Sequence, residues 1–239
     1  MDQAEYALMD AAETRMWWYR ALHARLAAAL AATTGPILDA GCGTGGLLAC
    51  LNATHDNLHG LEFNPAAAAL AATKSPVRIT QGSINAMPYA DASFAAAVSA
   101  DVLSHAGVNP TAALSELRRV LRPGGRLILN LPAYQWLLAT HDRRVHNTSR
   151  FTAGSARALL AAAGFTQIRT RYWNSLLFPL MLIQRKLLAS HDTAASDVAA
   201  FPPWLDATLH GITRAERRLP ALPFGGSVRV TATRPGATP

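Results

Sequence analysis

The sequence predicts an α/β fold in which a doubly wound, mostly parallel sheet carries helices on both faces. Short apolar runs typical of strands alternate with alanine- and leucine-rich segments typical of helices. The first apolar run ends in the turn Gly41-Cys42-Gly43-Thr44-Gly45-Gly46 and leads into a helix, which is the strand-turn-helix unit of nucleotide-binding sheets. A chain of 239 residues is long enough to bury the core of such a sheet.

The turn after the first strand, Ile37–Ala40, decides which ligand the fold is expected to bind. Glycine lets the backbone approach a ligand where a Cβ atom would collide, and the following helix directs N–H groups at that ligand. Gly41, Gly43 and Gly46 have the spacing of dinucleotide-binding turns, which on its own leaves a nicotinamide cofactor open. Asp39 favours another ligand, because a carboxylate there repels a pyrophosphate but attracts an ammonium or sulfonium group.

The segment Leu38-Asp39-Ala40-Gly41-Cys42-Gly43-Thr44-Gly45 resembles the first motif of the class I S-adenosylmethionine-dependent methyltransferases, and the chain looks like their type 11 and ubiquinone-menaquinone branch. The resemblance covers residues 35–172 and extends to the last strand. It includes Arg122-Pro123-Gly124-Gly125, a helix stop and turn that a dehydrogenase has no reason to require. The resemblance implies a Rossmann-like seven-stranded sheet and S-adenosyl-L-methionine as cofactor.

The resemblance also implies which residues hold this cofactor. Glu62, after the second strand, matches the carboxylate that accepts both ribose hydroxyls in the family, and Phe63 is expected to pack on the adenine. Relatives usually carry an aspartate where this chain has Ser83, whose hydroxyl is a weaker acceptor for the adenine amino group. The residues expected to contact the cofactor are Asp39, Gly41, Cys42, Gly43, Glu62, Phe63, Ser83, Ile84 and Asp101.

Two later segments carry the residues expected to act on the methyl acceptor. His105 follows the fourth strand, Phe94–Ser99, where catalytic groups of open α/β sheets collect, and histidine can take a proton near neutral pH. The long connection after the fifth strand resembles a branch of the family with a similar His-Asp-Arg sequence. The expected catalytic residues are His105, His141, Asp142 and His146, and the expected acceptor-binding residues are Trp18, Tyr19, Tyr134, Arg143 and Arg150.

In that connection, the histidines and Asp142 are expected to orient or deprotonate the acceptor. Arg143 or Arg150 is expected to hold an anionic part of it. A loop whose polar side chains satisfy only one another is the alternative interpretation.

The chain is expected to form a single domain, residues 1–239, with two additions to the cofactor-binding core at residues 35–172. Residues 1–33 predict two helices that, as in the family, lie over the substrate pocket as a lid. Residues 173–226 predict a helical insertion, and residues 227–234 the last strand, with one strand near the end antiparallel. The insertion is nearly continuously apolar from Leu176 to Ile183, which suits an acceptor site, a peripheral membrane contact or a homodimer interface.

Composition narrows the functional classes. The formal net charge of +7 is unevenly distributed. Residues 1–115 carry five basic and nine acidic residues, a net charge of −4, and residues 116–239 carry seventeen basic and six acidic residues, a net charge of +11. No basic run interleaved with aromatic residues occurs, so nucleic acid is not an expected partner. Cys42 and Cys50 fit neither a disulfide framework nor a metal site. With no secretory signal or spanning apolar run visible, a cytoplasmic location is expected.

The expected function is methyl transfer from S-adenosylmethionine to a small-molecule or lipid-linked acceptor, with O-methylation favoured. Positioning should supply most of the rate acceleration, because the sulfonium is already reactive, so a general base helps without being obligatory. Two alternatives remain open from the sequence. One is a protein of this fold that binds the cofactor without transferring its methyl group, and the other is an NAD-dependent oxidoreductase.

Overall fold

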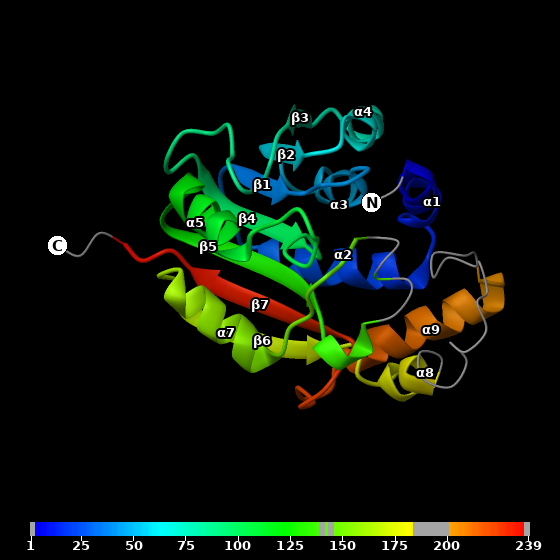
Figure 1. The fold of residues 1–239 in the computed structure, drawn as a ribbon. Coiled ribbons are helices and arrows are strands. Elements are labelled where there is room, and N and C mark those ends of the chain that lie inside the picture. Colours follow the sequence, from blue (N-terminus) through cyan, green and yellow to red (C-terminus); the bar gives the residue numbers. More distant parts are fainter. Residues whose placement is uncertain (1–2, 139–141, 143–145, 184–200, 237–239) are drawn as a thin grey trace.

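The computed structural model describes residues 3–138, 142, 146–183 and 201–236, and for residues 3–5 it describes the backbone alone. A seven-stranded sheet in the order β3-β2-β1-β4-β5-β7-β6 forms the centre of the molecule (Figure 1). Its strands are β1 Ile37–Ala40, β2 Leu58–Glu62, β3 Arg78–Gln81, β4 Phe94–Ala100, β5 Leu121–Pro132, β6 Thr166–Trp173 and β7 Ser227–Thr233. The neighbouring pairs β3–β2, β2–β1, β1–β4 and β4–β5 are parallel. Strand β7 runs antiparallel to both β5 and β6. The predicted fold class is confirmed.

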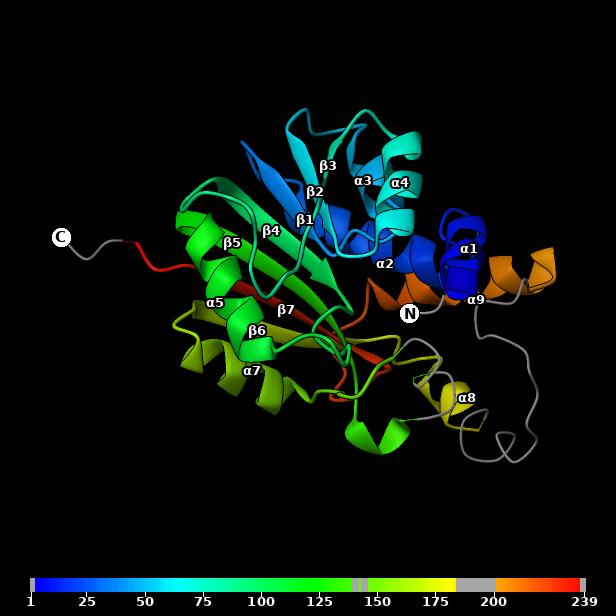
Figure 2. The ribbon, with the colours of Figure 1, turned by 45° about the horizontal axis from the view of Figure 1, so that its top comes forward.

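Helices cover both faces of the sheet, with α5 and α7 on one face and α2 and α3 on the other (Figure 2). The helices are α1 Gln3–Ala12, α2 Trp17–Leu30, α3 Gly46–Leu51, α4 Pro65–Lys74, α5 Pro110–Val120, α7 Ala153–Ala162, α8 Phe178–Ile183 and α9 Pro203–Glu216, with a 3-10 turn at Gln135–Leu137. Leu114, Leu117 and Leu160 fill one core layer, and Leu26, Leu48 and Leu51 fill the other. These leucines are fully buried, which makes the two layers the main hydrophobic stabilisation of the fold.

Local sequence signals explain where several helices begin. Asn64 accepts hydrogen bonds from the backbone N–H groups of Ala66 and Ala67 ahead of α4, and Pro65 occupies the first helical position. Thr152 starts α7 in a capping box with Ser155. These caps satisfy N–H groups that have no partner within a helix, so they fix where α4 and α7 begin.

Two element boundaries differ from the sequence interpretation. β5 begins at Leu121 rather than after the Pro-Gly-Gly turn, because Leu121 already pairs with Phe94 of β4. α8 begins at Phe178, so the apolar run from Leu176 is only partly helical. Both shifts come from tertiary pairing and packing, which residue pattern alone does not report.

The helix α9 packs along α2, although about 190 residues separate some of the contacting side chains. Asp206 accepts hydrogen bonds from the backbone N–H of Trp17 at 2.6 Å and from the Arg20 guanidinium at 2.8 Å. Farther along, Arg25 pairs with Glu216 at 3.4 Å, and both side chains are buried. The two chain additions are therefore held together by polar contacts at two points. Among the described helices, none combines the length and apolar character required to cross a bilayer.

Candidate functional site

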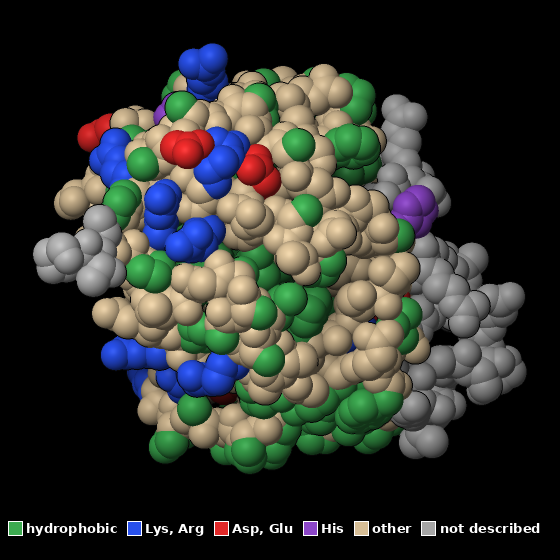
Figure 3. Space-filling view, turned by 60° about the vertical axis from the view of Figure 1, so that its left-hand side comes forward, with side chains coloured by type: hydrophobic (Ala, Val, Ile, Leu, Met, Phe, Trp, Pro, Cys, Tyr) green, Lys and Arg blue, Asp and Glu red, His purple; other side chains and the backbone are tan. Residues whose placement is uncertain are grey.

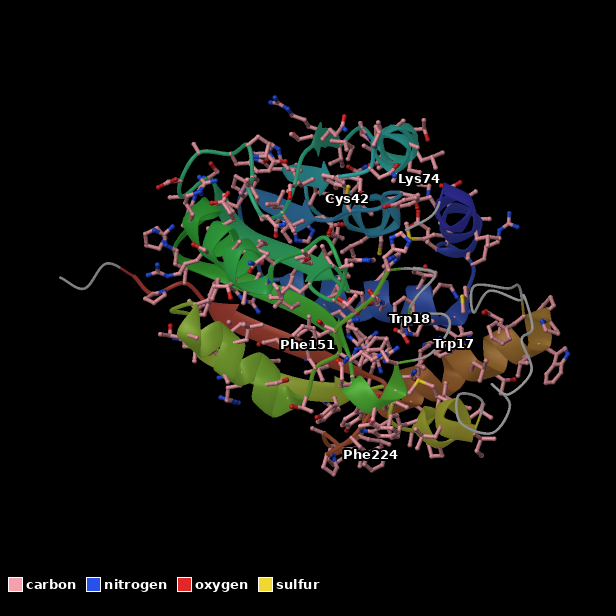
Figure 4. The ribbon with its side chains drawn as sticks, in the orientation of Figure 1. Trp17, Trp18, Cys42, Lys74, Phe151 and Phe224 are labelled. Carbon is pink, nitrogen blue, oxygen red and sulfur yellow. The ribbon has the colours of Figure 1, made fainter. Side chains whose placement is uncertain are left out.

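A cavity of about 640 Å³ lies where the parallel strands end. Residues directly after β1, β2, β3 and β4 line one side of it, which is where open α/β sheets bind ligands. Residues of α1, α2, α8 and α9 line the other side. Trp17 and Trp18 come from the start of α2, on the side of the molecule where α8 and α9 lie (Figure 4). Both additions to the core thus form walls of this cavity.

The glycine turn is held in shape by left-handed backbone conformations and by one carboxylate. Gly41 has a φ of 91°, and a Cβ atom there would lie 2.3 Å from Val102, so no larger residue fits. Glu62 accepts a hydrogen bond from the backbone N–H of Gly43 at 2.9 Å and one from that of Asn64 at 2.9 Å. This carboxylate therefore ties the turn after β1 to the end of β2.

The N-terminal helix α1 reaches into the same end of the cavity. Tyr6 forms a hydrogen bond with Glu62, and burial followed by the Glu62 charge raises the pKa of Tyr6 to about 12, so its hydroxyl stays protonated. Glu13 is buried and accepts a hydrogen bond from the Thr44 hydroxyl at 2.8 Å. Lys74 of α4 pairs with Glu13. Helix α1 is thereby fastened over the glycine turn.

Asp39 is the acidic group whose charge is least compensated at this end. It is 2% exposed, and burial, then the charges of Glu62 and Glu13, raise its pKa to about 8. A ligand that carries a cationic group would relieve this cost by supplying the missing opposite charge. The cluster of carboxylates at the glycine turn fits the ammonium and sulfonium groups of S-adenosylmethionine, and it does not fit a pyrophosphate.

We expect cofactor binding to release a proton from Asp39. Because the free carboxyl stays protonated below about pH 8, affinity for S-adenosylhomocysteine should rise by close to tenfold per pH unit between about pH 6 and 8, then level off. Isothermal titration in two buffers with different ionisation enthalpies measures the released proton. An Asp39→Asn variant should bind weakly and without this pH dependence. A flat affinity profile in the wild-type protein would contradict the assignment.

The segments that carry His105 and His146 lie side by side, although they follow different strands. The backbone of His105 pairs with Asn147, and the N–H of Ala106 donates to the carbonyl of His146 at 2.8 Å. The Ser104 hydroxyl donates to the Asn147 side chain at 2.8 Å. Both histidines line the cavity. The fold therefore brings together two of the residues that the sequence suggested as proton acceptors.

Asp142 and Arg150 form a buried ion pair, which changes the roles expected for both. Arg150 donates to Asp142 Oδ1 from Nη2 at 2.7 Å and from Nε at 3.1 Å, and from Nη1 to the carbonyl of Ala133 at 3.0 Å. The two side chains are only 1% and 5% exposed. A carboxylate that already accepts two charge-assisted hydrogen bonds is a poor base, and a guanidinium so engaged is a poor anchor for an anionic acceptor. The geometry favours the self-satisfied loop for this pair.

The remaining expected residues divide between the cavity and other places. Lining it are Asp39, Gly41, Cys42, Gly43, Glu62, Phe63, Ser83, Ile84, Asp101, Trp18 and Tyr19, together with His105, Asp142, His146 and Arg150. Tyr134 is not among the lining residues. Its ring stacks on the Tyr172 ring, with 5.4 Å between the ring centroids and 13° between the ring planes. Tyr134 therefore packs between the connection after β5 and strand β6. His141 and Arg143 lie outside the described residues.

The sequence interpretation missed several lining residues. Tyr6 and Met9 of α1, Glu13 just after it and His23 of α2 line the cavity, and burial with the nearby Lys74 charge lowers the pKa of His23 to about 4. That histidine is therefore neutral at physiological pH. No motif marks these positions, because they reach the cavity only through the docking of α1 and α2.

Two buried polar atoms in the cavity wall have no hydrogen-bond partner within the described part of the chain. They are the indole Nε1 of Trp17, a donor, and the side-chain Oδ1 of Asn174, an acceptor. A buried polar atom without a partner costs roughly 1–3 kcal/mol, so such atoms in a cavity wall mark places where a ligand can bind. Trp17 and Asn174 both line the cavity, but these two atoms are themselves inaccessible to solvent, so a ligand can reach them only if the surrounding side chains move.

Comparisons with known proteins agree with this geometry. Residues 38–129 match the family described as methyltransferase domain. A 37.1 kDa protein in a Streptomyces fradiae transposon is 35% identical over 107 residues, 42% of this chain, and the match spans about a third (31%) of the length of that relative.

Solved structures extend the likeness to nearly the whole chain. A Thermotoga maritima S-adenosylmethionine-dependent methyltransferase has a TM-score of 0.60 at 18% identity, over 97% of this chain and 95% of its own. The Haloferax volcanii protein solved in complex with a methyltransferase activator has a TM-score of 0.65 at 20% identity, over 98% and 96%. At these identities the likeness shows the shared fold.

Proposed function

We propose that this chain, whose residues 38–129 match the methyltransferase-domain family and whose fold is shared with S-adenosylmethionine-dependent methyltransferases, methylates a hydroxyl oxygen of an apolar small-molecule or lipid-linked acceptor. The observation that carries this proposal is a cavity with an acidic end at the glycine turn and an apolar end, where the lining residues Trp17 and Asn174 carry a buried donor and a buried acceptor without a partner among the described residues. A hydroxyl group both accepts and donates a hydrogen bond, so it matches the pair at the apolar end. The family match removes the oxidoreductase alternative.

The acidic end is proposed to hold the cofactor, which supplies an activated methyl group on a sulfonium. Asp39 would hold the ammonium group, because it lacks a compensating charge there. Glu62 would accept from the ribose hydroxyls, with Tyr6 as the neighbour that shares this carboxylate. Phe63, which is 74% exposed beside the cavity, and Ile84 would cover the adenine.

The apolar end is proposed to hold the acceptor. Besides Trp17 and Trp18, its wall includes Leu177 and Met181 of the insertion, with further apolar residues Leu22, Leu180, Phe201 and Leu209. The Arg150 charge at its edge is already balanced by Asp142, so the pocket favours an uncharged hydrophobic body. Leu180 lines the cavity and is also 54% exposed, which leaves an apolar path between the cavity and the surface. That path suits an acceptor with a hydrocarbon chain.

The reaction requires the acceptor oxygen to form a bond to the methyl carbon as the carbon–sulfur bond breaks, and the hydroxyl proton to leave. Trp17 Nε1 would donate to the oxygen and fix its orientation, which is where most of the acceleration arises. His105 or His146, both on the cavity wall, would accept the proton. Neither Trp17 Nε1 nor the amide oxygen of Asn174 is basic enough to accept this proton.

Methyl transfer can be tested directly with methyl-labelled cofactor and a panel of alcohols and phenols of increasing chain length, beside matched amines. We expect label transfer to the hydroxylated acceptors, with catalytic efficiency that rises with chain length. Transfer to the amines alone would overturn the proposed oxygen specificity. If the protein bound S-adenosylhomocysteine but labelled no acceptor in the panel, hydroxyl methylation would be refuted.

Removing the indole donor should weaken acceptor use selectively. In Trp17→Phe the ring remains but Nε1 is lost, so we expect KM for the hydroxylated acceptor to rise about tenfold, on the scale of one hydrogen bond. Affinity for S-adenosylhomocysteine should stay within about twofold, because the donor lies at the apolar end. Trp204→Phe is the matched control, since Trp204 is 70% exposed on α9 and does not line the cavity. An equal change in both variants would contradict the assignment.

A further inference from the structure

A second cavity, of about 100 Å³, lies between α2, α9 and the antiparallel edge of the sheet. Its wall contains Arg25 of α2, Arg171 and Trp173 of β6, Glu216 and Arg217 at the end of α9, and Arg229 of β7. Four guanidinium groups therefore face one carboxylate. None of these residues lines the larger cavity, so this site is separate from the proposed methyl-transfer site.

The single carboxylate is already used by the fold. Glu216 pairs with Arg25 and also accepts hydrogen bonds from the backbone N–H groups of Asn174, Ser175 and Leu176 at 2.8, 2.8 and 3.2 Å. It fixes the turn that leads from β6 toward α8. This carboxylate is shared among four donors, so it leaves most of the arginine charge in the cavity unbalanced.

The arginines differ in how far their own hydrogen bonds are satisfied. Arg25 donates to the carbonyl of Thr213 at 3.0 Å and lies over the Trp173 ring at 4.6 Å, and Arg171 donates to the carbonyl of Leu219 at 2.7 Å. Within the described ranges, the side chains of Arg217 and Arg229 take part in no hydrogen bond or ion pair. Two of the four guanidinium groups thus keep their donors available to a ligand.

Strand register adds to the repulsion between these groups. Arg171 and Arg229 are directly opposite each other in the β6–β7 ladder, and like charges at paired positions destabilise a sheet. Burial, then Arg171 and Arg217, lowers the pKa of Arg229. Burial also lowers the pKa of Arg25 to about 10, against the opposing effect of Glu216. The second half of the sequence, residues 116–239, carries a formal net charge of +11. Figure 3 shows Lys and Arg side chains gathered in groups on the face that it draws.

We propose that the second cavity binds an oxyanion of the phosphate class, either free or as the headgroup of a lipid or other phosphomonoester. Guanidinium groups present planar pairs of N–H donors that match the oxygens of phosphate, and several can share one such group. The volume is that of roughly three water molecules at about 30 Å³ each, which suits one phosphoryl group and is too small for a nucleotide. Trp173 forms an apolar side of the site beside Arg25.

The first test is isothermal titration of the full chain with inorganic phosphate, in potassium chloride at constant ionic strength. We expect saturable binding by the wild-type protein, weakened at least tenfold in Arg229→Gln and in Arg217→Gln. Arg169→Gln is the matched control. It removes the same charge from the same strand as Arg171, but Arg169 is exposed and lies outside the cavity. Absence of binding, or equal weakening in all three variants, would overturn the proposal.

A melting experiment separates a ligand site from a purely structural cluster. Without phosphate, Arg229→Gln should melt at a higher temperature than the wild-type protein, because it removes one of four repelling charges. With phosphate, the wild-type protein should gain stability by mass action and the variant should not, so the difference shrinks or reverses. A variant that melts lower in chloride and is stabilised by phosphate as strongly as the wild type would refute the proposal.

The source of the anion is decided by flotation with vesicles of equal parts phosphatidylcholine and phosphatidic acid. Flotation that inorganic phosphate competes away and that Arg229→Gln abolishes would assign the site to a lipid phosphate. Phosphate binding without flotation would assign it to a free phosphate or phosphomonoester. These readouts need no methyl acceptor. The phosphate site can therefore be refuted while the proposed methyl transfer stands, and the methyl transfer can be refuted while the phosphate site stands.

Discussion

Replacing Asp142 with alanine should lower the free energy of unfolding by about 3–5 kcal/mol, because it leaves the Arg150 guanidinium buried without its counter-ion. Both side chains are almost fully inaccessible, and the Arg150 guanidinium donates two hydrogen bonds to this one carboxylate oxygen. Urea denaturation of the purified variant measures the loss.

Asp91→Ala is the control for this prediction. Asp91 pairs with Arg119 at 2.8 Å, but its side chain is 76% exposed, so the expected cost is about 0–1 kcal/mol. A double variant, Asp142→Leu with Arg150→Met, should regain much of the stability lost in Asp142→Ala, since it removes the unpaired charge. If Asp142→Ala cost no more than Asp91→Ala, the ion pair would have no structural role, and the catalytic interpretation of Asp142 would regain its place.

Replacing Glu62 with alanine should weaken S-adenosylhomocysteine binding by about a hundred- to a thousandfold, the scale of two charged hydrogen bonds at 1.5–3 kcal/mol each with partial compensation. The loss has two sources. The carboxylate would no longer accept from the ribose, and the N–H groups of Gly43 and Asn64 would lose the acceptor that shapes the turn. Isothermal titration measures the affinity, and circular dichroism shows whether the variant is folded.

Glu116→Ala provides the comparison for Glu62. Glu116 likewise accepts from a backbone N–H, that of Met87 at 2.6 Å, and pairs with Arg119, yet it does not line the cavity. Its removal should cost stability and leave cofactor affinity within about twofold. Unchanged affinity in a folded Glu62→Ala protein would show that the ribose lies elsewhere. Tyr6→Phe tests the contribution of the Tyr6 hydroxyl to cofactor affinity separately, since it leaves the Glu62 carboxylate in place and removes only the hydroxyl that hydrogen-bonds to it.

The sequence could predict that the residues expected to hold the cofactor lie together, because the signals for their placement are local. Asp39 and the glycines after it lie within one strand and one turn, and Glu62 ends the adjacent strand, so parallel pairing alone brings them together. The physical requirement for glycine at Gly41 is also visible in the motif. Residue type and spacing are sufficient where the geometry is set by neighbouring elements.

The acceptor end could not be predicted to the same degree, because burial and long-range docking decide it. Asp142 and Arg150 are as polar in the sequence as any catalytic pair, and only their burial shows that they neutralise each other. Tyr134 was expected in the pocket, but its ring stacks on Tyr172 of β6. The contacts of Asp206 and Glu216 with α2 span 186 to 191 residues, a distance over which no sequence pattern reports pairing.

The position of β7 between β5 and β6 has a consequence for the order in which the protein forms on the ribosome. Among the described strands, β6 pairs with β7 alone, so none of them can pair with it until residues 227–233 have been synthesised. The ion pairs of α2 with Asp206 and Glu216 likewise form only after α9 has been synthesised. A nascent chain that stalls before β7 would expose the edge of β5, which is a template for intermolecular strand pairing. Strands β1 to β5 can therefore pair before β7 has been synthesised, whereas the β5–β7–β6 part of the sheet forms later, and it is the part in which folding is expected to be slow and prone to aggregation.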